Sequence, residues 1–320
     1  MRILTGIQPS GKLHIGNYFS VMRKMIEYQE KFDAFTFIAN LHALTTFSSK
    51  EEQYQNTLDA VCDYLALGVD PEKNTFWLQS DVPIVTELSW YLSMSISVSS
   101  LSLAHSYKDK VAKGVSPNAG LYYYPILMAA DILAFNTNKV PVGKDQKQHL
   151  EYTRDMAVRF NATYGETFIV PEPEIEENSA IIPGIDGQKM SKSYGNTITI
   201  FDDEKKIKKA VMSIVTDSAE IDVPKDPDSS VLFAIYSLFL GKEEVQKLKD
   251  RFATPGLRYG DVKKELFSAI MDYFSPYRTK RAELAQNKDY IKEVLRKGAD
   301  KASQAASIQM EKVRRNMGIR

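Results

Sequence analysis

The chain has 320 residues and a mass of 36.2 kDa, more than one hydrophobic core usually serves, so we expect two domains. Its 43% hydrophobic and 26% charged residues are typical of a soluble globular protein and exclude a disordered chain. Residues 1–185 carry 15 Lys and Arg against 21 Asp and Glu (net −6), whereas residues 186–320 carry 26 against 20 (net +6). The basic second half is consistent with a polyanionic partner, but from charge alone ordinary scatter between two domains is the favoured explanation.

Cysteine usage and hydropathy set further limits. The single cysteine, Cys62, excludes an intrachain disulfide framework and a zinc site built from several cysteines, and it favours a cytoplasmic protein. The N-terminus lacks the apolar core of a secretory signal. The apolar stretch 231–240 is shorter than the roughly 20 residues that a membrane-spanning helix needs.

The first 80 residues alternate short apolar runs with stretches of helical periodicity. We expect, in order, a strand at 3–7, a helix at 18–32, a strand at 35–39, a helix at 51–67 that ends at Gly68, and a strand at 76–79. This alternation predicts an α/β fold, a Rossmann-like parallel sheet with crossover helices.

One segment fits two patterns. Residues 93–98 alternate Ser with Met, Ile and Val, as in a half-buried strand, whereas Leu88, Leu92 and Ile96 lie four apart, as on a helix. We favour a helix over 93–102 because the run continues from Val85 without a turn signal, and a strand stays open.

The clearest break in the pattern is the Pro- and Gly-rich segment 170–188. Beyond Asp202, which suits a helix N-cap, strand patterns nearly vanish. Helical patterns recur at 229–240, 242–252, 259–274, 277–297 and 300–316. We therefore expect a Rossmann-like domain over 1–185, then a mobile loop and an all-helical domain over 186–320. The last helix is expected to pack back on the first domain.

The first chemical motif runs from Gly6 to Asn17, between a strand and a helix, where open α/β sheets bind nucleotides. Gly6, Gly11 and Lys12 match most of a P-loop, but Leu13 stands where Mg²⁺ needs a hydroxyl. Alternatively, His14-Ile15-Gly16-Asn17 opens a helix at which a histidine can donate a hydrogen bond to a phosphate oxygen. A lone histidine is more often a structural residue, so this tetrapeptide alone is a weak signal.

The second motif is Lys189-Met190-Ser191-Lys192-Ser193, which follows the Pro- and Gly-rich break. Two lysines three apart, with hydroxyls beside them, can wrap a polyphosphate. A solvated basic loop is the alternative interpretation.

The two motifs together resemble those of the class I aminoacyl-tRNA synthetases. The second is a full match, and the first departs only at Asn17, where histidine is usual. The runs 6–11, 128–133 and 140–149 resemble the tryptophanyl-tRNA synthetase family more than its tyrosyl sibling. The resemblance spans essentially the full chain.

The resemblance implies a two-step reaction. ATP and tryptophan give tryptophanyl-adenylate and pyrophosphate, and tryptophan is then transferred to the 3′-terminal adenosine of tRNA(Trp). The first domain would bind ATP and tryptophan, and the helical domain would bind the anticodon. Mg²⁺ would be held by ATP phosphates rather than by a protein metal site, and the enzyme would be a homodimer. Two rivals remain: a related nucleotidyltransferase that adenylylates a small molecule, and a non-catalytic tRNA-binding relative.

Asp131 is the most informative residue outside the two motifs. We expect a helix over 125–135, opened by Pro125, with Tyr124, Met128, Asp131 and Ile132 on one face. Asp131 lies among apolar neighbours, and a buried carboxylate must find a donor. That donor is either another group of the protein or, as the resemblance implies, the indole N–H of tryptophan.

The resemblance also implies the site residues. Those that act on the phosphates would be Gln8, His14, Lys189 and Lys192. Lys144 stands where an acidic residue is expected. ATP would be bound by Gln8, Pro9, Ser10, His14, Gly16, Asn17, Gly143, Lys144, Asp145, Ile181, Lys189, Met190, Ser191, Lys192 and Ser193. Tryptophan would be bound by Leu4, Gly6, Ala39, His42, Tyr124, Met128, Asp131, Ile132, Val140, Val142 and Gln146.

Overall fold

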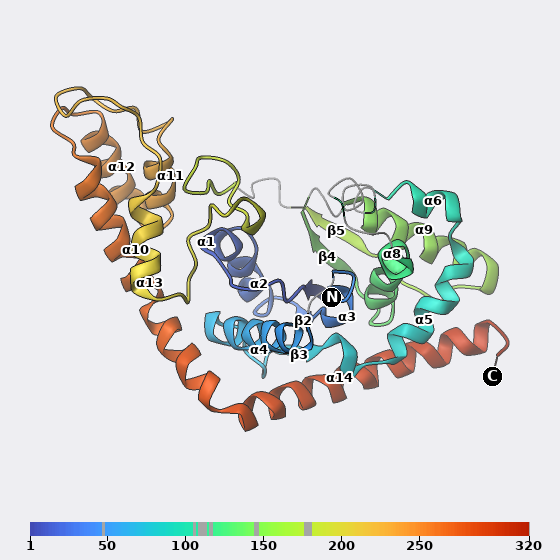
Figure 1. Cartoon of the computed structure of the whole chain (residues 1–320). Coiled ribbons are helices and arrows are strands. Elements are labelled where there is room, and N and C mark those ends of the chain that lie inside the picture. Colours follow the sequence, from blue (N-terminus) through green and yellow to red (C-terminus); the bar gives the residue numbers. More distant parts are fainter. Residues whose placement is uncertain are drawn as a thin grey trace. The chain divides into compact units, whose positions relative to one another are not determined.

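A computed structural model describes residues 1–46, 49–104, 107, 114, 118–143, 147–175 and 181–319. The chain forms two compact units, drawn together in Figure 1. The first unit comprises Met1–Gly11, Met25–Glu177 and Asn287–Arg320, and the second comprises Lys12–Lys24 and Asn178–Gln286. The predicted single boundary at 185/186 therefore differs from the structure, because the chain passes between the units four times.

The first unit is built on a parallel five-stranded sheet with the strand order β3-β2-β1-β4-β5. The strands are β1 (Arg2–Ile7), β2 (Asp33–Ile38), β3 (Asn74–Leu78), β4 (Lys139–Val142) and β5 (Glu172–Ile175). The expected strands 3–7, 35–39 and 76–79 are thus confirmed within one or two residues. The order reverses at β1, which is the point where open α/β sheets bind ligands.

Helices connect these strands, and several begin and end where the sequence indicates. They are α2 (Arg23–Tyr28), α3 (Asn40–Ala43), α4 (Lys50–Leu67), α5 (Ile84–Leu92), α6 (Val98–Ser102), α8 (Ala119–Leu133) and α9 (Lys147–Tyr164), with 3₁₀ turns η2 (Gln79–Asp81) and η3 (Ser93–Ser95). Ser49 caps α4, and Gly68 ends it with φ of +121°. The segment 93–102 is helical, as favoured, although its two helices are separated by an extended Ile96.

Helix α8 corrects one prediction. It begins at Ala119 and not at Pro125, because the side chain of Asn118 accepts a hydrogen bond from the backbone N–H of Leu121 and caps the helix there. Pro125 therefore lies inside the helix and removes one hydrogen bond from it. Asp131 remains on the helix, at 2% exposure.

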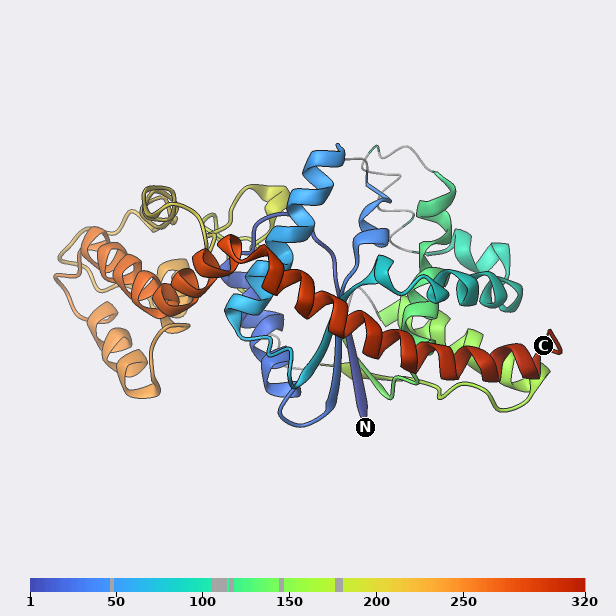
Figure 2. The same ribbon diagram turned by 90° about the horizontal axis from the view of Figure 1, so that it is seen from below.

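The C-terminal helix α14 (Lys288–Asn316) belongs to the first unit and lies against the edge strand β3 and against α5 (Figures 1 and 2). Gly298 permits the approach, since a Cβ on it would lie 1.9 Å from the carbonyl oxygen of Phe76. At the far end, Arg314 forms an ion pair with Glu87 of α5. The predicted helices at 277–297 and 300–316 are therefore wrong in their bounds. One helix runs through Pro276 and ends only at Gln286, and α14 begins at Lys288.

The second unit contains α1 (Ile15–Asn17), one stretch of π-helix η1 (Tyr18–Met22), the 3₁₀ turn η5 (Lys192–Tyr194), and helices α10 (Glu204–Met212), α11 (Val231–Ser237), α12 (Lys242–Phe252) and α13 (Tyr259–Gln286). In the described residues from 203 to 319, every regular element is a helix, as predicted. The N-cap of α10 is Asp203, not Asp202, whose carboxylate is engaged elsewhere. Across the described part of the chain, no helix is long and apolar enough to cross a membrane.

The close contact between α14 and β3 leads to a test of the fold. The substitution Gly298→Ala places a methyl group into the Phe76 carbonyl, and overpacking of this kind costs about 1–3 kcal/mol. We expect a lower melting temperature in calorimetry. Gly260→Ala in α13 is the matched control, because its Cβ meets no atom within 4 Å and alanine favours the helix by up to about 1 kcal/mol. Equal melting temperatures for the two variants would contradict the packing described here.

Candidate active site

The first unit contains a cavity of about 360 Å³ at the carboxyl ends of β1, β2 and β4. This size falls within the usual range for small-molecule sites. Its walls are mainly apolar and include one acidic group. It is lined by Leu4, Thr5, Gly6, Gln8, Phe37, Ala39, His42, Thr45, Tyr124, Met128, Asp131, Ile132, Val140, Pro141 and Val142.

The structure brings together ten of the eleven residues predicted around the amino acid, all of them lining this cavity. The eleventh, Gln146, lies outside the described residues. Gln8, predicted to contact ATP, lines the cavity as well. Four other lining residues were not predicted from the sequence: Thr5, Phe37, Thr45 and Pro141.

Gly6 acts through Phe37. A Cβ at Gly6 would lie 2.6 Å from the tip of the Phe37 ring, so any side chain there would displace the ring. The Phe37 ring in turn packs against buried Trp77, with centroids 5.5 Å apart. Glycine at this position therefore sets the position of an aromatic wall of the cavity.

Asp131 is held by two side chains that follow neighbouring strands and form hydrogen bonds with it. Nε2 of His42 lies 2.9 Å from Oδ2 of Asp131, and Nε2 of Gln79 donates to the same oxygen at 2.7 Å. Both hydrogen bonds that His42 and Gln79 make with Asp131 thus end on Oδ2. Burial raises the pKa of the Asp131 carboxyl, whereas these hydrogen bonds act to lower it. A further donor from a ligand would also favour the charged form.

Gln79 was missed by the sequence analysis, although it fixes the orientation of the acidic group. Its side-chain oxygen accepts from the backbone N–H groups of Leu41 and His42, so its amide nitrogen must point to Asp131. Only 1% of Gln79 is exposed. A polar residue directly after the apolar strand 74–78, at the ligand-binding edge of the sheet, is the signal that could have identified it.

Tyr124 lies on the same helix as Asp131, and its hydroxyl forms a hydrogen bond with Nε2 of the fully buried His149. This contact fixes the phenol ring at the cavity wall. Pairing with His149 was not predicted from the sequence.

In the second unit, His14 is the N-cap of α1. Its Nδ1 accepts a hydrogen bond from the backbone N–H of Asn17, while the side-chain oxygen of Asn17 accepts from the backbone N–H of His14. This reciprocal pair is a capping box. Burial, and then the nearby charge of Lys192, lower the pKa of His14 to about 4. The ring is therefore neutral at pH 7 and carries its proton on Nε2.

The segment Lys189–Ser193 follows a compact turn in the same unit. Asn196 organises it, since its side-chain oxygen accepts from the N–H of Ser191 and its amide donates to Asp186 and to the carbonyl of Lys189. Lys189 and Lys192 are exposed, whereas Met190 is buried against Gly16, where a Cβ would meet its side chain at 3.3 Å. Gly16 thus lets the two motifs pack closely.

The other residues predicted at ATP are divided between the units. Gln8, Pro9, Ser10 and Gly143 belong to the first unit, and Ile181, 71% exposed, belongs to the second with Asn17, Ser191 and Ser193. Lys144 and Asp145 lie outside the described residues.

Comparison with known proteins matches residues 1–275 to the family of class I tRNA synthetases for W and Y. The tryptophan–tRNA ligase of Fusobacterium nucleatum is 51% identical over 99% of this chain and 98% of its own length, and that of Rhodopirellula baltica is 46% identical over the full length of both. A crystal structure of tryptophanyl-tRNA synthetase from Campylobacter jejuni, complexed with ADP and tryptophan, superposes with a TM-score of 0.96 at 49% identity, covering 99% of this chain and all of that one.

The chain belongs to the class I tRNA synthetases, within the tryptophan–tRNA ligase family. The expected resemblance and the α/β fold class are thereby confirmed.

The neutral state of His14 in this synthetase is directly measurable. With ¹⁵N-labelled imidazole, we expect the Nε2–H tautomer from pH 8 to about 5 and a midpoint near 4, instead of the ordinary 6.5. Because the folded pKa lies below the unfolded one, His14 contributes full stability above about 6.5 and loses it as the pH falls towards 4.

His14→Gln assigns the resonance, since the chain has four histidines. Lys192→Ala should raise the His14 midpoint by removing the nearby cation. A midpoint near 6.5 in the unmodified protein would contradict a neutral donor.

Proposed function

We propose that this synthetase activates tryptophan with ATP and transfers it to the 3′-terminal adenosine of tRNA(Trp). The observation that supports this most strongly is the buried carboxylate of Asp131 on the wall of an otherwise apolar cavity, fixed through Oδ2 by His42 and Gln79. A flat apolar ring that has one N–H group satisfies both features of the cavity.

In this proposal Oδ1 of Asp131 accepts the indole N–H, while Phe37 and Met128 contact the ring. Phenylalanine offers no such donor and would leave the buried acceptor unpaired, which strongly disfavours it. Tyrosine has a donor at a different distance and angle. Tyr124 and Gln146 are assigned to the α-amino and carboxylate groups.

The activation step needs no protein nucleophile. A carboxylate oxygen of tryptophan attacks the α-phosphorus and forms an O–P bond, the bond from that phosphorus to the bridging oxygen breaks, and pyrophosphate leaves. Lys189 and Lys192 neutralise the charge that develops on the leaving group, and the Nε2–H of neutral His14 donates to a phosphate oxygen. Gln8 orients the α-phosphate. Mg²⁺ would be held by the phosphate oxygens of ATP rather than by side chains of this chain, and it would neutralise part of their charge.

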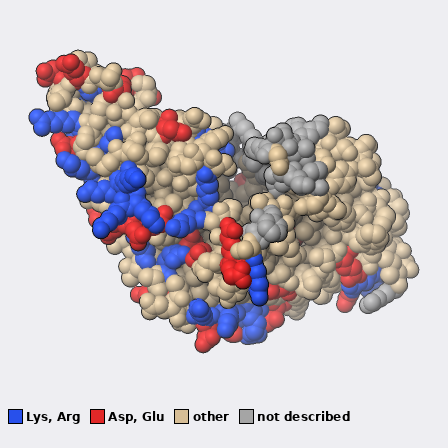
Figure 3. Space-filling model, in the orientation of Figure 1, with Lys and Arg blue, Asp and Glu red and all other residues tan. Residues whose placement is uncertain are grey.

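For the second step, the 2′-hydroxyl of the terminal adenosine takes the acyl group, and AMP leaves. We assign the helices of 186–286 to anticodon binding. Lys and Arg side chains gather over α10 in Figure 3, where Lys205 and Lys209 are exposed. Such a surface suits a phosphate backbone, and affinity from this source falls with salt.

We further propose a cytoplasmic homodimer. Trp90, Met94, Val98 and Leu103 are more than half exposed along α5, η3 and α6, and contiguous apolar side chains of this size mark protein interfaces. We assign this surface to a second copy of the chain, because the family resemblance implies a homodimer. The proposed cytoplasmic location rests on the substrates, because free tryptophan, ATP and tRNA occur together there.

ATP–pyrophosphate exchange with each of the twenty amino acids tests the proposed activity. Tryptophan alone should stimulate exchange. Lys192→Ala should slow adenylate formation about 100-fold or more, as the loss of one charge-stabilising group does, with tryptophan affinity unchanged. Stimulation by tyrosine alone, or by no amino acid, would overturn the proposal.

Asp131→Asn tests the recognition of the indole. The asparagine oxygen accepts from His42 and Gln79, so its NH₂ group replaces Oδ1 and faces the indole N–H, donor against donor. We expect kcat/KM for tryptophan to fall roughly 10- to 100-fold.

The benzothienyl analogue of tryptophan, which has sulfur in place of the N–H, serves as the control substrate. Its kcat/KM should change little in the variant, so that discrimination between the two substrates is lost. An equal loss of kcat/KM for both substrates would show that Asp131 does not recognise the indole N–H.

A further inference from the structure

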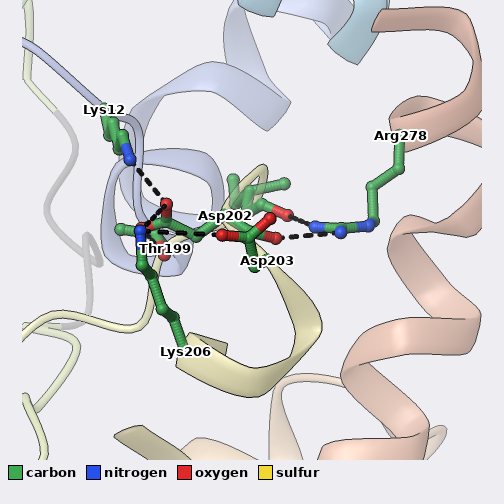
Figure 4. Close-up of polar contacts among 7 residues, drawn as sticks. Lys12, Thr199, Asp202, Asp203, Lys206 and Arg278 are labelled. Carbon is green, nitrogen blue, oxygen red and sulfur yellow. Dashed lines mark hydrogen bonds and ion pairs between the residues drawn. The ribbon is translucent and has the colours of Figure 1, made fainter. Parts of the chain in front are cut away.

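The lysine of the P-loop-like motif has a partner in the structure that the proposed chemistry does not use. Nζ of Lys12 lies 2.5 Å from Oδ1 of Asp202, which is 190 residues away in the sequence (Figure 4). The lysine side chain is 64% exposed and the aspartate side chain only 14%. Lys12 therefore pairs with the chain that leaves the Lys189–Ser193 segment.

The backbone joins the same two segments. The N–H of Ile15 donates to the carbonyl of Ile198 at 3.0 Å, and the N–H of Ile200 donates to the carbonyl of Leu13 at 3.1 Å. His14 and Thr199 form an antiparallel bridge between these bonds. Residues 12–15 and 198–202 thus form a short two-stranded ribbon, with the cap residue His14 in one strand and Lys192 six residues before the other.

The carboxylate of Asp202 lies at the end of this ribbon and contacts side chains from both of its strands. Thr199 donates to Oδ2 at 2.9 Å, and Lys206 lies 3.9 Å from Oδ1. Burial acts to raise the pKa of Asp202, but the hydrogen bonds from Lys12 and Thr199, together with the charges of Lys12 and Lys206, lower this pKa overall. The charged form, which holds Lys12, is therefore favoured.

Helix α13 holds the ribbon from its other side. The guanidinium of Arg278 donates to the carbonyl oxygens of Ile200 at 2.6 Å and of Asp202 at 2.9 Å (Figure 4). One turn earlier, Phe274 packs edge-on against Tyr18, with ring centroids 5.2 Å apart. The same stretch of α13 therefore fixes both the ribbon and the helix that His14 opens.

We propose that Lys12, Asp202 and Arg278 are positioning residues. They fix His14, the proposed hydrogen-bond donor to a phosphate oxygen, relative to the Lys189–Ser193 segment. This inference rests on the proposed function. An ion pair whose lysine side chain is largely exposed to water contributes little to the stability of a fold. A misplacement of about 1 Å, in contrast, can cost a reaction up to 100-fold. Loss of the pair should therefore affect the rate much more than the folding.

The experiment measures ATP–pyrophosphate exchange, adenylate formation in a single turnover, and tryptophan affinity for the full chain and four variants: Lys12→Met, Asp202→Asn, their combination, and Lys206→Met. Lys206 is the matched control, because its side chain is 63% exposed but lies farther from Asp202. We expect kcat to fall about 10-fold in each single variant of the pair, KM for ATP to change less than about 3-fold, and tryptophan affinity to stay unchanged. Lys206→Met should change kcat by less than about 2-fold.

Coupling between the two residues distinguishes positioning from direct contact with ATP. If Lys12 acts through Asp202, the double variant is no slower than either single variant. Lys12→Arg should restore most of the rate, because arginine can still reach the carboxylate, and Arg278→Lys should lose rate by keeping one hydrogen bond of two. Multiplicative losses, a normal rate in Asp202→Asn, or a Lys12→Met variant no slower than Lys206→Met would overturn the proposal.

A second measurement does not depend on activity. Lys192→Ala should raise the His14 midpoint in ¹⁵N spectra, and this upward shift should shrink in the Lys12→Met background, where the ribbon no longer fixes the distance. An undiminished shift would contradict the inference even if exchange were absent. Absence of tryptophan-dependent exchange in the unmodified chain would, by contrast, refute the proposed function.

Discussion

The need of one buried carboxylate for hydrogen-bond donors organises the amino-acid site. Asp131 sits on α8 at 2% exposure, where an unpaired charge is costly. His42 follows β2 and Gln79 follows β3, so pairing with Asp131 joins the ends of two strands to the helix. Gln79 also binds the backbone at the start of α3, which fixes its own direction. The acidic group in the wall of an otherwise apolar cavity is thereby positioned by three elements at once.

The residues proposed to bind tryptophan and those proposed to bind the phosphates belong to different units of the fold. The cavity is formed entirely within the first unit, whereas His14 and the Lys189–Ser193 segment belong to the second. The short stretch Lys12–Lys24 gives the second unit its histidine although it follows β1 in the sequence. In the proposed mechanism, tryptophan binding and phosphate binding would therefore depend on different sets of contacts, so that a substitution could change one and leave the other intact.

Local sequence patterns predicted what local physics determines, namely the buried strands, the parallel class of the sheet, and α4 with its Gly68 end. The ten cavity residues were predicted from the family resemblance and not from local patterns. The features that the sequence did not predict depend on residues far away in the sequence or on a single helix-capping side chain. Asn118 starts α8 ahead of the proline that seemed to open it. Gly298 brings α14 onto β3 through a contact 222 residues away in the sequence, which helical periodicity does not reveal. Gln79 and Lys12 are likewise explained by partners 52 and 190 residues distant.

Asn17 shows how a departure from a family pattern can serve the same chemistry. Its side-chain oxygen accepts from the N–H of His14, and its own N–H donates to Nδ1 of that ring. With Nδ1 occupied as an acceptor, the single proton of the neutral imidazole must reside on Nε2. A neutral ring also avoids repulsion by Lys192, which already lowers its pKa. In the proposed activation step, the neutral ring would orient a phosphate oxygen while the lysines neutralise charge. The side chain of Asn17 supports the ring's position by capping the backbone N–H of His14, and it adds no second titratable group.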